Sequence, residues 1–197
     1  VWQETTGESS IQGLENLLLP GNGQADLFDG QITRIKNGAT GKASFLLDFG
    51  RELQGGIQVV TGRSSKKEMK IRVRFGESVS EAMCDITPEN GATNDHAIRD
   101  FYLTLPWLGV AEIGNSGFRF VRIDLEEPDA ELSLKEIRAT FGYRNIPYLG
   151  SFKCDNERLN DIWMTGAYTV HLNMQEYIWD GVKRDRLVWI GDLHPEL

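Results

Sequence analysis

The sequence predicts a mainly β fold, a jelly-roll-like β-sandwich followed by a helical segment at the C-terminus. Two observations lead to this prediction. Short runs of alternating apolar and polar residues fill most of the chain, and a run with apolar residues at three- and four-residue steps comes after them. This change of period divides the chain into a predicted β-sandwich domain over residues 1–146 and the start of an incomplete helical domain over residues 147–197.

The clearest predicted strand covers residues 69–75. Its apolar side chains stand at every second position, and the side chains between them are cationic. A period of two residues is typical of a strand with one buried face and one solvated face. The apolar face consists of Met69, Ile71, Val73 and Phe75, and the polar face of Lys70, Arg72 and Arg74.

Other strand-like runs are rich in β-branched and aromatic residues, and they cover residues 44–49, 57–60, 101–105, 118–125 and 132–141. The glycines of residues 50–56 are expected to form a hairpin between the first two runs. In each of the last two runs the apolar phase changes once, first at Phe120-Val121, which predicts a β-bulge or burial on both faces. The expected turns are Asp29-Gly30, Asn37-Gly38, Asn90-Gly91 and Asn115-Ser116-Gly117.

One amphipathic helix is predicted from about residue 155 to residue 175, with Asp155 as its N-cap. A single helix cannot bury its own apolar stripe, so the stripe packs on the sandwich or belongs to a larger helical domain. If the stripe stays uncovered, the resulting patch predicts self-association of this chain. The stripe consists of Leu159, Ile162, Trp163, Gly166, Val170 and Met174.

The composition excludes several classes of partner. The 197 residues include 21 Lys and Arg against 29 Asp and Glu, which gives a net charge of -8. Nucleic acids and anionic membranes attract clustered Lys and Arg, so we expect neither as a partner. No apolar run approaches the roughly 20 residues that span a bilayer. The sequence has no zinc-site spacing and no calcium loop, so we expect neither a metal nor a cofactor. It does not indicate a cellular compartment.

The densest group of chemically useful side chains lies in residues 180–192. The stretch holds three carboxylates, three cations and Trp189. If residues 185–192 are helical, Asp185, Trp189 and Asp192 share one face, because they stand at i, i+4 and i+7. A carboxylate beside an indole ring can act as a general acid, and the ring can stack on a sugar. The same pattern is also typical of a solvated helix face with ion pairs, which is the alternative interpretation.

This stretch resembles the signature of the bacterial α-L-rhamnosidases of glycoside hydrolase family 78. In that family an Asp is followed five residues later by the general-acid Glu. A Trp comes four residues after the Glu, and another Asp three residues after the Trp. In this sequence the spacing selects Asp180, Asp185, Trp189 and Asp192.

The resemblance extends to earlier parts of the chain. Residues 150–163 resemble the beginning of the family's catalytic domain, and residues 73–78 and 117–122 resemble the β-sandwich that precedes it. The resemblance implies β-sandwich domains placed before an (α/α)₆ barrel. It also implies inverting cleavage of terminal α-L-rhamnose from a rhamnose-containing glycan or glycoside.

The resemblance also implies roles for individual residues. Asp185 would be the catalytic general acid. The subsite for the terminal sugar would be lined by Asp180, Trp189 and Asp192. We add Arg184 to this subsite because it is adjacent to Asp185.

The sequence departs from the family pattern in two ways. Asp185 stands where the family usually has Glu, so the acid has a shorter arm. Catalysis then requires a small backbone shift, or a neighbouring carboxylate such as Glu196 serves instead. The general base of the family is a Glu much further along the barrel, which would lie beyond Leu197. The chain is therefore expected to be an N-terminal piece with little or no activity alone.

A second hypothesis comes from a different class of protein, a non-catalytic carbohydrate-binding or scaffolding β-sandwich. The aromatic residues of the strands and the missing general base motivate it. Tyr102 and Trp107 could form the sugar-binding face, and packing in the core or at a domain interface is the alternative interpretation of both. The two hypotheses differ in where a sugar binds. The enzyme hypothesis places it at residues 180–192, and the binding-module hypothesis places it within residues 1–145.

Overall fold

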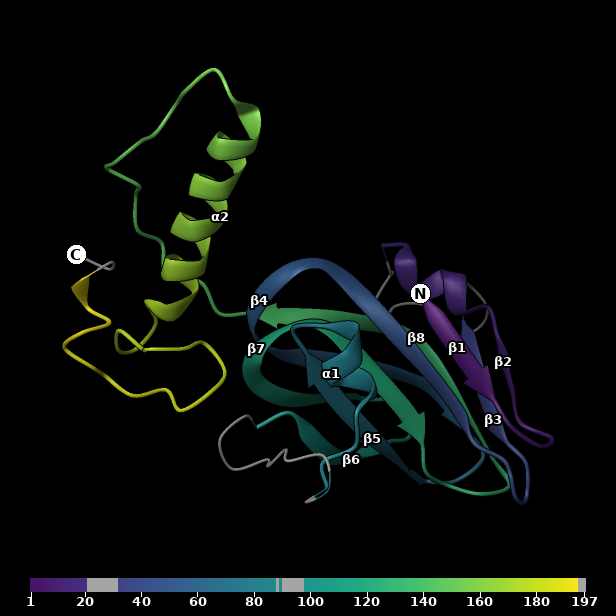
Figure 1. Cartoon of the computed structure of the whole chain (residues 1–197). Coiled ribbons are helices and arrows are strands. Elements are labelled where there is room, and N and C mark those ends of the chain that lie inside the picture. Colours follow the sequence, from purple (N-terminus) through teal and green to yellow (C-terminus); the bar gives the residue numbers. More distant parts are fainter. Residues whose placement is uncertain (21–31, 88, 90–97, 195–197) are drawn as a thin grey trace.

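A computed structural model describes residues 1–20, 32–87, 89 and 98–194 of the chain. It confirms the prediction of a mainly β fold with a helix near the C-terminus (Figure 1). In chain order the elements are β1 (Trp2–Thr5), β2 (Ser10–Gln12), the 3₁₀ helix η1 (Leu14–Leu18), β3 (Thr33–Asn37), β4 (Ala43–Ser64), β5 (Glu68–Gly76), α1 (Val79–Met83), β6 (Asp100–Pro106), β7 (Val110–Leu125), β8 (Ala130–Phe141) and α2 (Glu157–Asn173).

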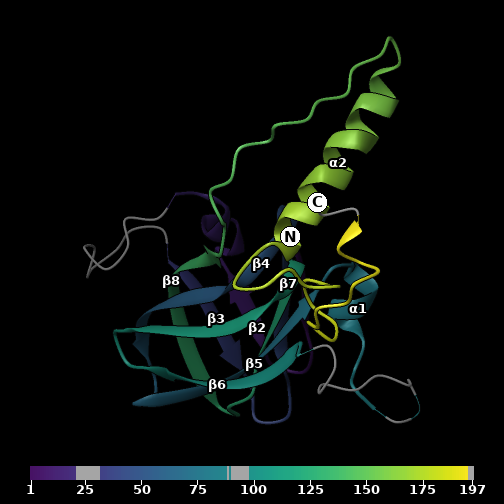
Figure 2. The ribbon, with the colours of Figure 1, turned by 90° about the vertical axis from the view of Figure 1, so that its left-hand side faces the viewer.

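All paired strands are antiparallel and belong to one sheet, in the order β2-β3-β8-β4-β7-β5-β6. The long strand β4 is its centre, because it pairs with β7 and β8 and also with β1. The strands curve around one hydrophobic cluster, to which strands from both ends of the sheet contribute (Figure 2). The core includes residues of β4 and β7, and the C-terminal segment contacts these two strands.

Strand β5 confirms the predicted alternation. Met69, Ile71, Val73 and Phe75 are at most 1% exposed, and all four belong to the core. Burial of each such side chain contributes about 1.5–3 kcal/mol relative to an exposed position. The strand lies between β6 and β7, so both of its edges are hydrogen-bonded.

The predicted hairpin at residues 50–56 is wrong, because β4 runs continuously through these residues. The glycines are required for close approach between strands rather than for a turn. A Cβ on Gly55 would lie 1.9 Å from the carbonyl oxygen of Thr140, and a Cβ on Gly56 would lie 2.4 Å from that of Gly114. The expected turn at residues 115–117 is also wrong, since these residues lie inside β7.

Both changes of apolar phase coincide with irregular pairing, as predicted. Asp48 pairs with Phe120 and Leu53 pairs with Phe118, so residues 49–52 of β4 lie opposite Arg119 alone. We call residues 49–52 the β4 bulge. In β8, Glu136 pairs with Val60 and Leu134 pairs with Thr61, so Lys135 between them has no partner in β4. Each extra residue shifts the side chains from one face to the other.

The predicted turn at Asn37-Gly38 is confirmed, and the Asn37 side chain stabilises it. Its amide donates hydrogen bonds to the carbonyl oxygens of Leu125 (2.8 Å) and Glu127 (3.0 Å), and its oxygen accepts one from the backbone of Ala43 (2.8 Å). The expected turns at Asp29-Gly30 and Asn90-Gly91 lie outside the described residues.

The N-cap of helix α2 lies one residue later in the chain than predicted. Asn156, not Asp155, is the N-cap, and its side-chain oxygen accepts a hydrogen bond from the backbone of Arg158 (3.1 Å). The helix projects from the end of the sheet near β4 and β7 (Figures 1 and 2). Leu159 and Ile162 of the predicted stripe are 47% and 57% exposed. The described part of the chain therefore leaves the apolar stripe largely uncovered.

The C-terminal end of α2 is held by His171, which is 1% exposed. Its Nε2 lies 2.6 Å from the carbonyl oxygen of Arg144, which can only accept, so Nε2 carries the proton. Its Nδ1 lies 3.1 Å from the hydroxyl oxygen of Tyr143 and 3.1 Å from that of Tyr148. These bonds fix the helix to the connection that precedes it. None of the helices described has the length and apolar character needed to cross a membrane.

Candidate functional site

The segment that follows α2 turns back toward the sheet and carries all the predicted site residues (Figure 2). Residues 185–192 do not form the helix that would place the site residues on one face, and Asp185 and Arg186 have positive φ angles of 62° and 53°. Left-handed backbone at two consecutive non-glycine residues breaks a right-handed helix. Asp185, Trp189 and Asp192 therefore do not share a helix face, which corrects that prediction.

Asp180 closes residues 180–187 into a loop. Its backbone N–H donates to the carbonyl oxygen of Leu187 (2.9 Å), and its Oδ1 accepts a hydrogen bond from the N–H of Leu187 (2.8 Å). One carboxylate oxygen of Asp180 thus maintains the loop, and we call residues 180–187 the closed loop. The structure brings three predicted site residues into it, Asp180, Arg184 and Asp185.

Asp185 and Arg184 occupy the exposed side of the closed loop. The side chain of Arg184 is 79% exposed and its Nε lies 3.6 Å from Oδ2 of Asp185, whose side chain is 35% exposed. A carboxyl group in this position is reachable by a ligand from solvent. It has a cation beside it that can balance its charge.

Trp189 and Asp192 form a separate turn after the closed loop. The N–H of Asp192 donates to the carbonyl oxygen of Trp189 (3.2 Å), and both side chains are exposed, that of Trp189 to 53%. The exposed indole is available for stacking. Glu196, the other carboxylate considered from the sequence, lies outside the described residues.

Arg186 braces the closed loop from inside. Its guanidinium donates to the carbonyl oxygen of Val182 from Nε (3.1 Å) and from a terminal nitrogen (2.9 Å), and it lies 4.8 Å from the ring centre of Trp179. Burial lowers the pKa of Arg186. The sequence analysis did not separate this residue from its charged neighbours, because its acceptor is a backbone group.

Lys183 attaches the closed loop to the sheet. It is 5% exposed, and its Nζ lies 2.8 Å from Oε1 of Glu81 in α1. Val182 beside it packs over Gly117, where an added Cβ would lie 2.5 Å from Cγ1 of Val182. Sequence reasoning missed this role, because Lys183 reads as one more charge in a run of charges.

Glu52 and Glu77 complete a group of carboxyl side chains around the buried Lys183; Glu52 is partly buried and Glu77 is exposed. Burial, followed by the charge of Glu77, raises the pKa of Glu52 to about 8, although Lys183 acts in the opposite direction. Burial also raises the pKa of Glu77, whose backbone N–H donates to Oε2 of Glu81 (2.8 Å). The carboxyl groups and the partial burial thus act together to favour the protonated form of Glu52. Within the described ranges no group of His, Cys, Asp and Glu side chains has a metal-binding arrangement.

The β4 bulge positions both C-terminal elements. The backbone carbonyl of Glu52 accepts a hydrogen bond from the hydroxyl of Tyr168 in α2, and the guanidinium of Arg51 lies 3.8 Å from the centre of the Tyr168 ring. The side chain of Glu52 meanwhile faces the closed loop near Gly117. A local irregularity of one strand thus orients the helix and the loop together.

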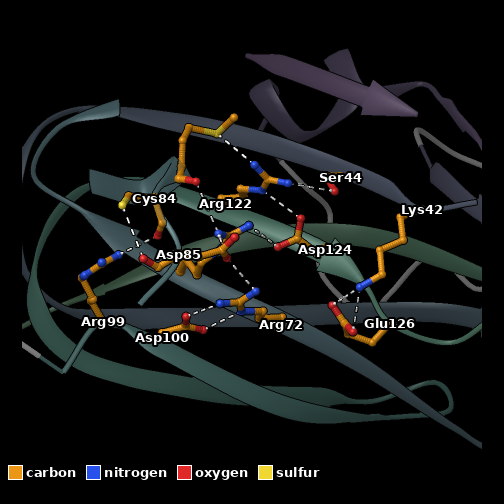
Figure 3. A network of polar contacts seen from close by, with 12 residues as sticks. Lys42, Ser44, Arg72, Cys84, Asp85, Arg99, Asp100, Arg122, Asp124 and Glu126 are labelled. Carbon is orange, nitrogen blue, oxygen red and sulfur yellow. Dashed lines mark hydrogen bonds and ion pairs between the residues drawn. The ribbon is translucent and has the colours of Figure 1, made fainter. Parts of the chain in front are cut away.

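A second group of polar side chains lies on the face of β4, β5 and β7 that points away from the core (Figure 3). Arg74 and Asp124 form a buried ion pair of 2.8 Å, and Arg122 Nε lies 2.8 Å from the other oxygen of Asp124. Burial alone would raise the pKa of Asp124, but the Ser44 hydrogen bond and the nearby guanidinium groups outweigh it and lower the pKa. We call this group the polar face.

The aromatic residues proposed for sugar binding on the strands are exposed, Tyr102 to 57% and Trp107 to 50%. Tyr102 has Lys70 Nζ 4.3 Å from its ring centre. Trp107 lines an open hollow with residues 64–67 at the end of the sheet. The two side chains therefore have different neighbours, and neither lines a hollow of the polar face.

The C-terminal part of the chain is similar to a known protein family. Residues 147–196 match the family model of the bacterial α-L-rhamnosidase six-hairpin glycosidase domain. This match contains the closed loop and the turn at Trp189, and with them all five predicted site residues. No curated protein sequence matches the chain significantly.

Solved structures then relate the fold to particular enzymes. A rhamnosidase from Klebsiella oxytoca with rhamnose bound aligns with 98% of this chain and 39% of its own, at 16% identity and a TM-score of 0.64. A family 78 rhamnosidase of Bacillus sp. GL1 aligns with 91% of this chain and 17% of its own, at 20% identity and a TM-score of 0.69. The chain therefore resembles the α-L-rhamnosidases in fold, and it spans less than half the length of each.

Proposed function

We propose that this chain is the N-terminal piece of a glycoside hydrolase that removes terminal α-L-rhamnose with inversion. The match of residues 147–196 to the rhamnosidase glycosidase domain carries the proposal, because it contains all five predicted site residues. The fold likeness to two rhamnosidases supports it. The ligand is a rhamnose-containing glycan or glycoside.

In this proposal Asp185 is the general acid. It protonates the leaving glycosidic oxygen while the bond to the sugar breaks, and water attacks the opposite face of the ring. Its accessible carboxyl group, with Arg184 Nε 3.6 Å away, supports the assignment. Asp has a shorter arm than Glu, so this role requires a small shift of the loop, whose backbone is left-handed at Asp185.

The remaining residues bind the terminal sugar. Asp180 has Oδ1 engaged with Leu187, which leaves Oδ2 to accept from a sugar hydroxyl. Trp189 offers its exposed ring to an apolar sugar face, and Asp192 and Arg184 supply further polar contacts. An inverting enzyme also needs a base roughly 6.5–9.5 Å from the acid, and we assign it to a carboxylate beyond Leu197.

The proposal includes a division of the complete enzyme into domains. Residues 1–146 form a jelly-roll-like β-sandwich, and residues 147–197 begin an (α/α)₆ barrel. The exposed stripe of α2, with Ile162 57% exposed, supports this division, because further helices would cover it. Without them, the chain alone is expected to self-associate through α2 and to be inactive.

The test uses the complete enzyme encoded by the gene, assayed on an activated aryl α-L-rhamnoside and on an alkyl α-L-rhamnoside. Asp185→Asn should lower kcat on the alkyl substrate by more than about 100-fold, and less on the activated one, because only a poor leaving group needs full protonation. Asp161→Asn on the exposed surface of α2 is the matched control. Equal rates for wild type and Asp185→Asn on the alkyl substrate would remove Asp185 from this role.

A further inference from the structure

We infer that the outer face of β1, β4 and β7, around Trp2, Ser44 and Arg122, binds a neutral pyranose residue of a glycan, separately from the closed loop. The choice of a sugar as ligand rests on the proposed function. The location rests on strand register, on two adjoining hollows and on the balance of charge in them. It would give the chain a binding activity in addition to the proposed catalytic one.

The polar half of this site is a row of side chains across four strands. Glu4 pairs with Ser44, Ser44 with Asp124, and Asp124 with Arg72. Residues paired directly across antiparallel strands point to the same side of a sheet, so these side chains share one face. They line an open hollow of about 310 Å³, and Figure 3 shows the ion pairs that form its floor.

The apolar half is the next row. Trp2 pairs with Leu46, and Leu46 pairs with Arg122. Trp2, Leu46 and Phe120 line a second hollow of about 280 Å³. The guanidinium of Arg122 lies 5.6 Å from the Trp2 ring, which brings the two halves together. The polar hollow alone, at about 310 Å³, has the size of the smaller ligand sites, which is about 300–1,000 Å³.

The balance of charge favours a neutral ligand. Four Lys or Arg residues and four Asp or Glu residues line the polar half, so their formal charges cancel. A phosphate, a sulfate or a metal ion would meet as much repulsion as attraction there. The hydroxyls of a pyranose both donate and accept, and they can use guanidinium and carboxylate groups side by side. The exposed ring of Trp2 offers the apolar surface that a sugar ring also needs.

Two groups at this site have hydrogen-bonding capacity to spare. One terminal nitrogen of Arg122 lies 3.3 Å from the sulfur of Met83, a weak acceptor, and the other lies 3.4 Å from Ser44 Oγ. Glu4 forms no ion pair with any residue that the structure describes. A sugar hydroxyl would improve the contacts of Arg122, and Glu4 would accept from a second hydroxyl.

The floor of the site is structural, so the test variants leave it intact. Arg74 and Asp124 have side chains only 4% and 5% exposed, and removal of either would leave a buried charge unpaired. Trp2 and Glu4 instead lie on the exposed strand β1, where substitution disturbs little packing. Trp2→Ala and Glu4→Gln therefore remove ligand contacts without removing the floor.

The experiment is NMR titration of the 197-residue chain with methyl α-L-rhamnopyranoside, up to about 50 mM so that millimolar affinities are covered. The chain has five tryptophans, and each contributes one indole N–H signal. Single substitutions assign these signals. The probe thus distinguishes Trp2 at the inferred site from Trp189 at the proposed catalytic site and from Trp107 at the end of the sheet.

The expected result is a saturable shift of the Trp2 signal with Kd about tenfold weaker in Glu4→Gln, and loss of binding at this face in Trp2→Ala. Trp107→Ala and Asp185→Asn should leave that Kd unchanged. Shifts confined to Trp189, or no shift of Trp2 at the highest concentration, would overturn the inference. The proposed function fails separately, because it depends on Asp185 in the complete enzyme, where Trp2→Ala should still hydrolyse the aryl rhamnoside at the wild-type rate.

Discussion

Lys183 Nζ lies 2.8 Å from Glu81 Oε1, and the lysine side chain is only 4% exposed. This pair connects the closed loop, which carries Asp180 and Asp185, to helix α1 at the surface of the sheet. The two residues are far apart in sequence, so the contact fixes one part of the chain against the other. A ligand at the closed loop would therefore meet residues whose positions depend on the sheet.

The first prediction concerns this ion pair. Lys183→Met should destabilise the chain by about 1–3 kcal/mol, because Glu81 would lose its ion-pair partner and Glu52 and Glu77 would lose the cation that lowers their pKa values. The measurement is the urea midpoint at neutral pH. Arg184→Met is the matched control, since its side chain is 79% exposed and its loss should change stability by less than about 0.5 kcal/mol.

A double-mutant cycle tests whether the effect comes from the pair itself. Lys183→Met in a Glu81→Gln background should cost less than in the wild type, because one of the carboxylates is then absent. Additive effects of the two substitutions would contradict a direct interaction between Lys183 and Glu81.

The second prediction concerns the pH dependence of stability. The pKa of Glu52 is about 8 in the folded chain, above the ordinary value of 4.5, so the folded state binds more protons between these values. The stabilising contribution is complete below about pH 4.5 and is lost as the pH rises through about 8. Glu77 shifts in the same direction, while Lys183 lowers both pKa values.

Urea midpoints at pH 5.5, 7 and 8.5 measure this dependence, because these pH values run from well below the pKa of Glu52 to just above it. Glu52→Gln should be more stable than the wild type at the highest pH and should show a flatter profile. Glu4→Gln, an exposed carboxylate on β1, is the control and should keep the wild-type slope. Parallel profiles for Glu52→Gln and the wild type would mean that Glu52 does not titrate in this range.

Much of the sheet could be predicted because its signals are local. The alternation in Met69–Phe75 follows from one face being buried, and the phase change at Phe120 marks a real irregularity of pairing. Gly55 and Gly56 were misinterpreted for a physical reason. In a sequence, a glycine can indicate a turn or a place where two strands come close together, because it lacks a Cβ. Only the folded sheet shows that Gly55 and Gly56 allow close contact with Thr140 and Gly114.

The candidate site was located by spacing, but its geometry was not. The resemblance selected Asp180 and Asp185, and both lie in the closed loop. The helix assumed for residues 185–192 fails, because Asp180 bonds Leu187 and two consecutive residues are left-handed. The role of Lys183 depends on Glu52 and on other carboxyl groups far away in sequence. A pattern of neighbouring residues cannot predict such partners.

The third prediction concerns the contact between the closed loop and Gly117 of β7. Gly117→Ala should displace the loop, because the new Cβ would lie 2.5 Å from Val182 Cγ1, 3.1 Å from Glu52 Oε1 and 3.3 Å from Lys183 Cβ. Limited proteolysis should then cut within residues 174–194 faster than in the wild type. Gly166→Ala is the matched control, since nothing lies within 4 Å of its Cβ position. In the helix interior that change should stabilise the chain by about 1 kcal/mol. An unchanged cleavage rate in Gly117→Ala would show that the loop does not depend on this contact.

The fourth prediction concerns the exposed stripe of α2. Leu159 and Ile162 of this stripe are 47% and 57% exposed, and the described residues of the chain leave them uncovered. Exposed apolar patches of this kind promote association, so the chain alone should form concentration-dependent oligomers in light scattering. Ile162→Glu should shift the population to monomer, because a charge in the contact would have to be desolvated. Thr165→Glu, on the same helix but outside the stripe, should leave the oligomers intact. A monomer at all concentrations, with the amides of α2 protected from exchange, would contradict association through this helix.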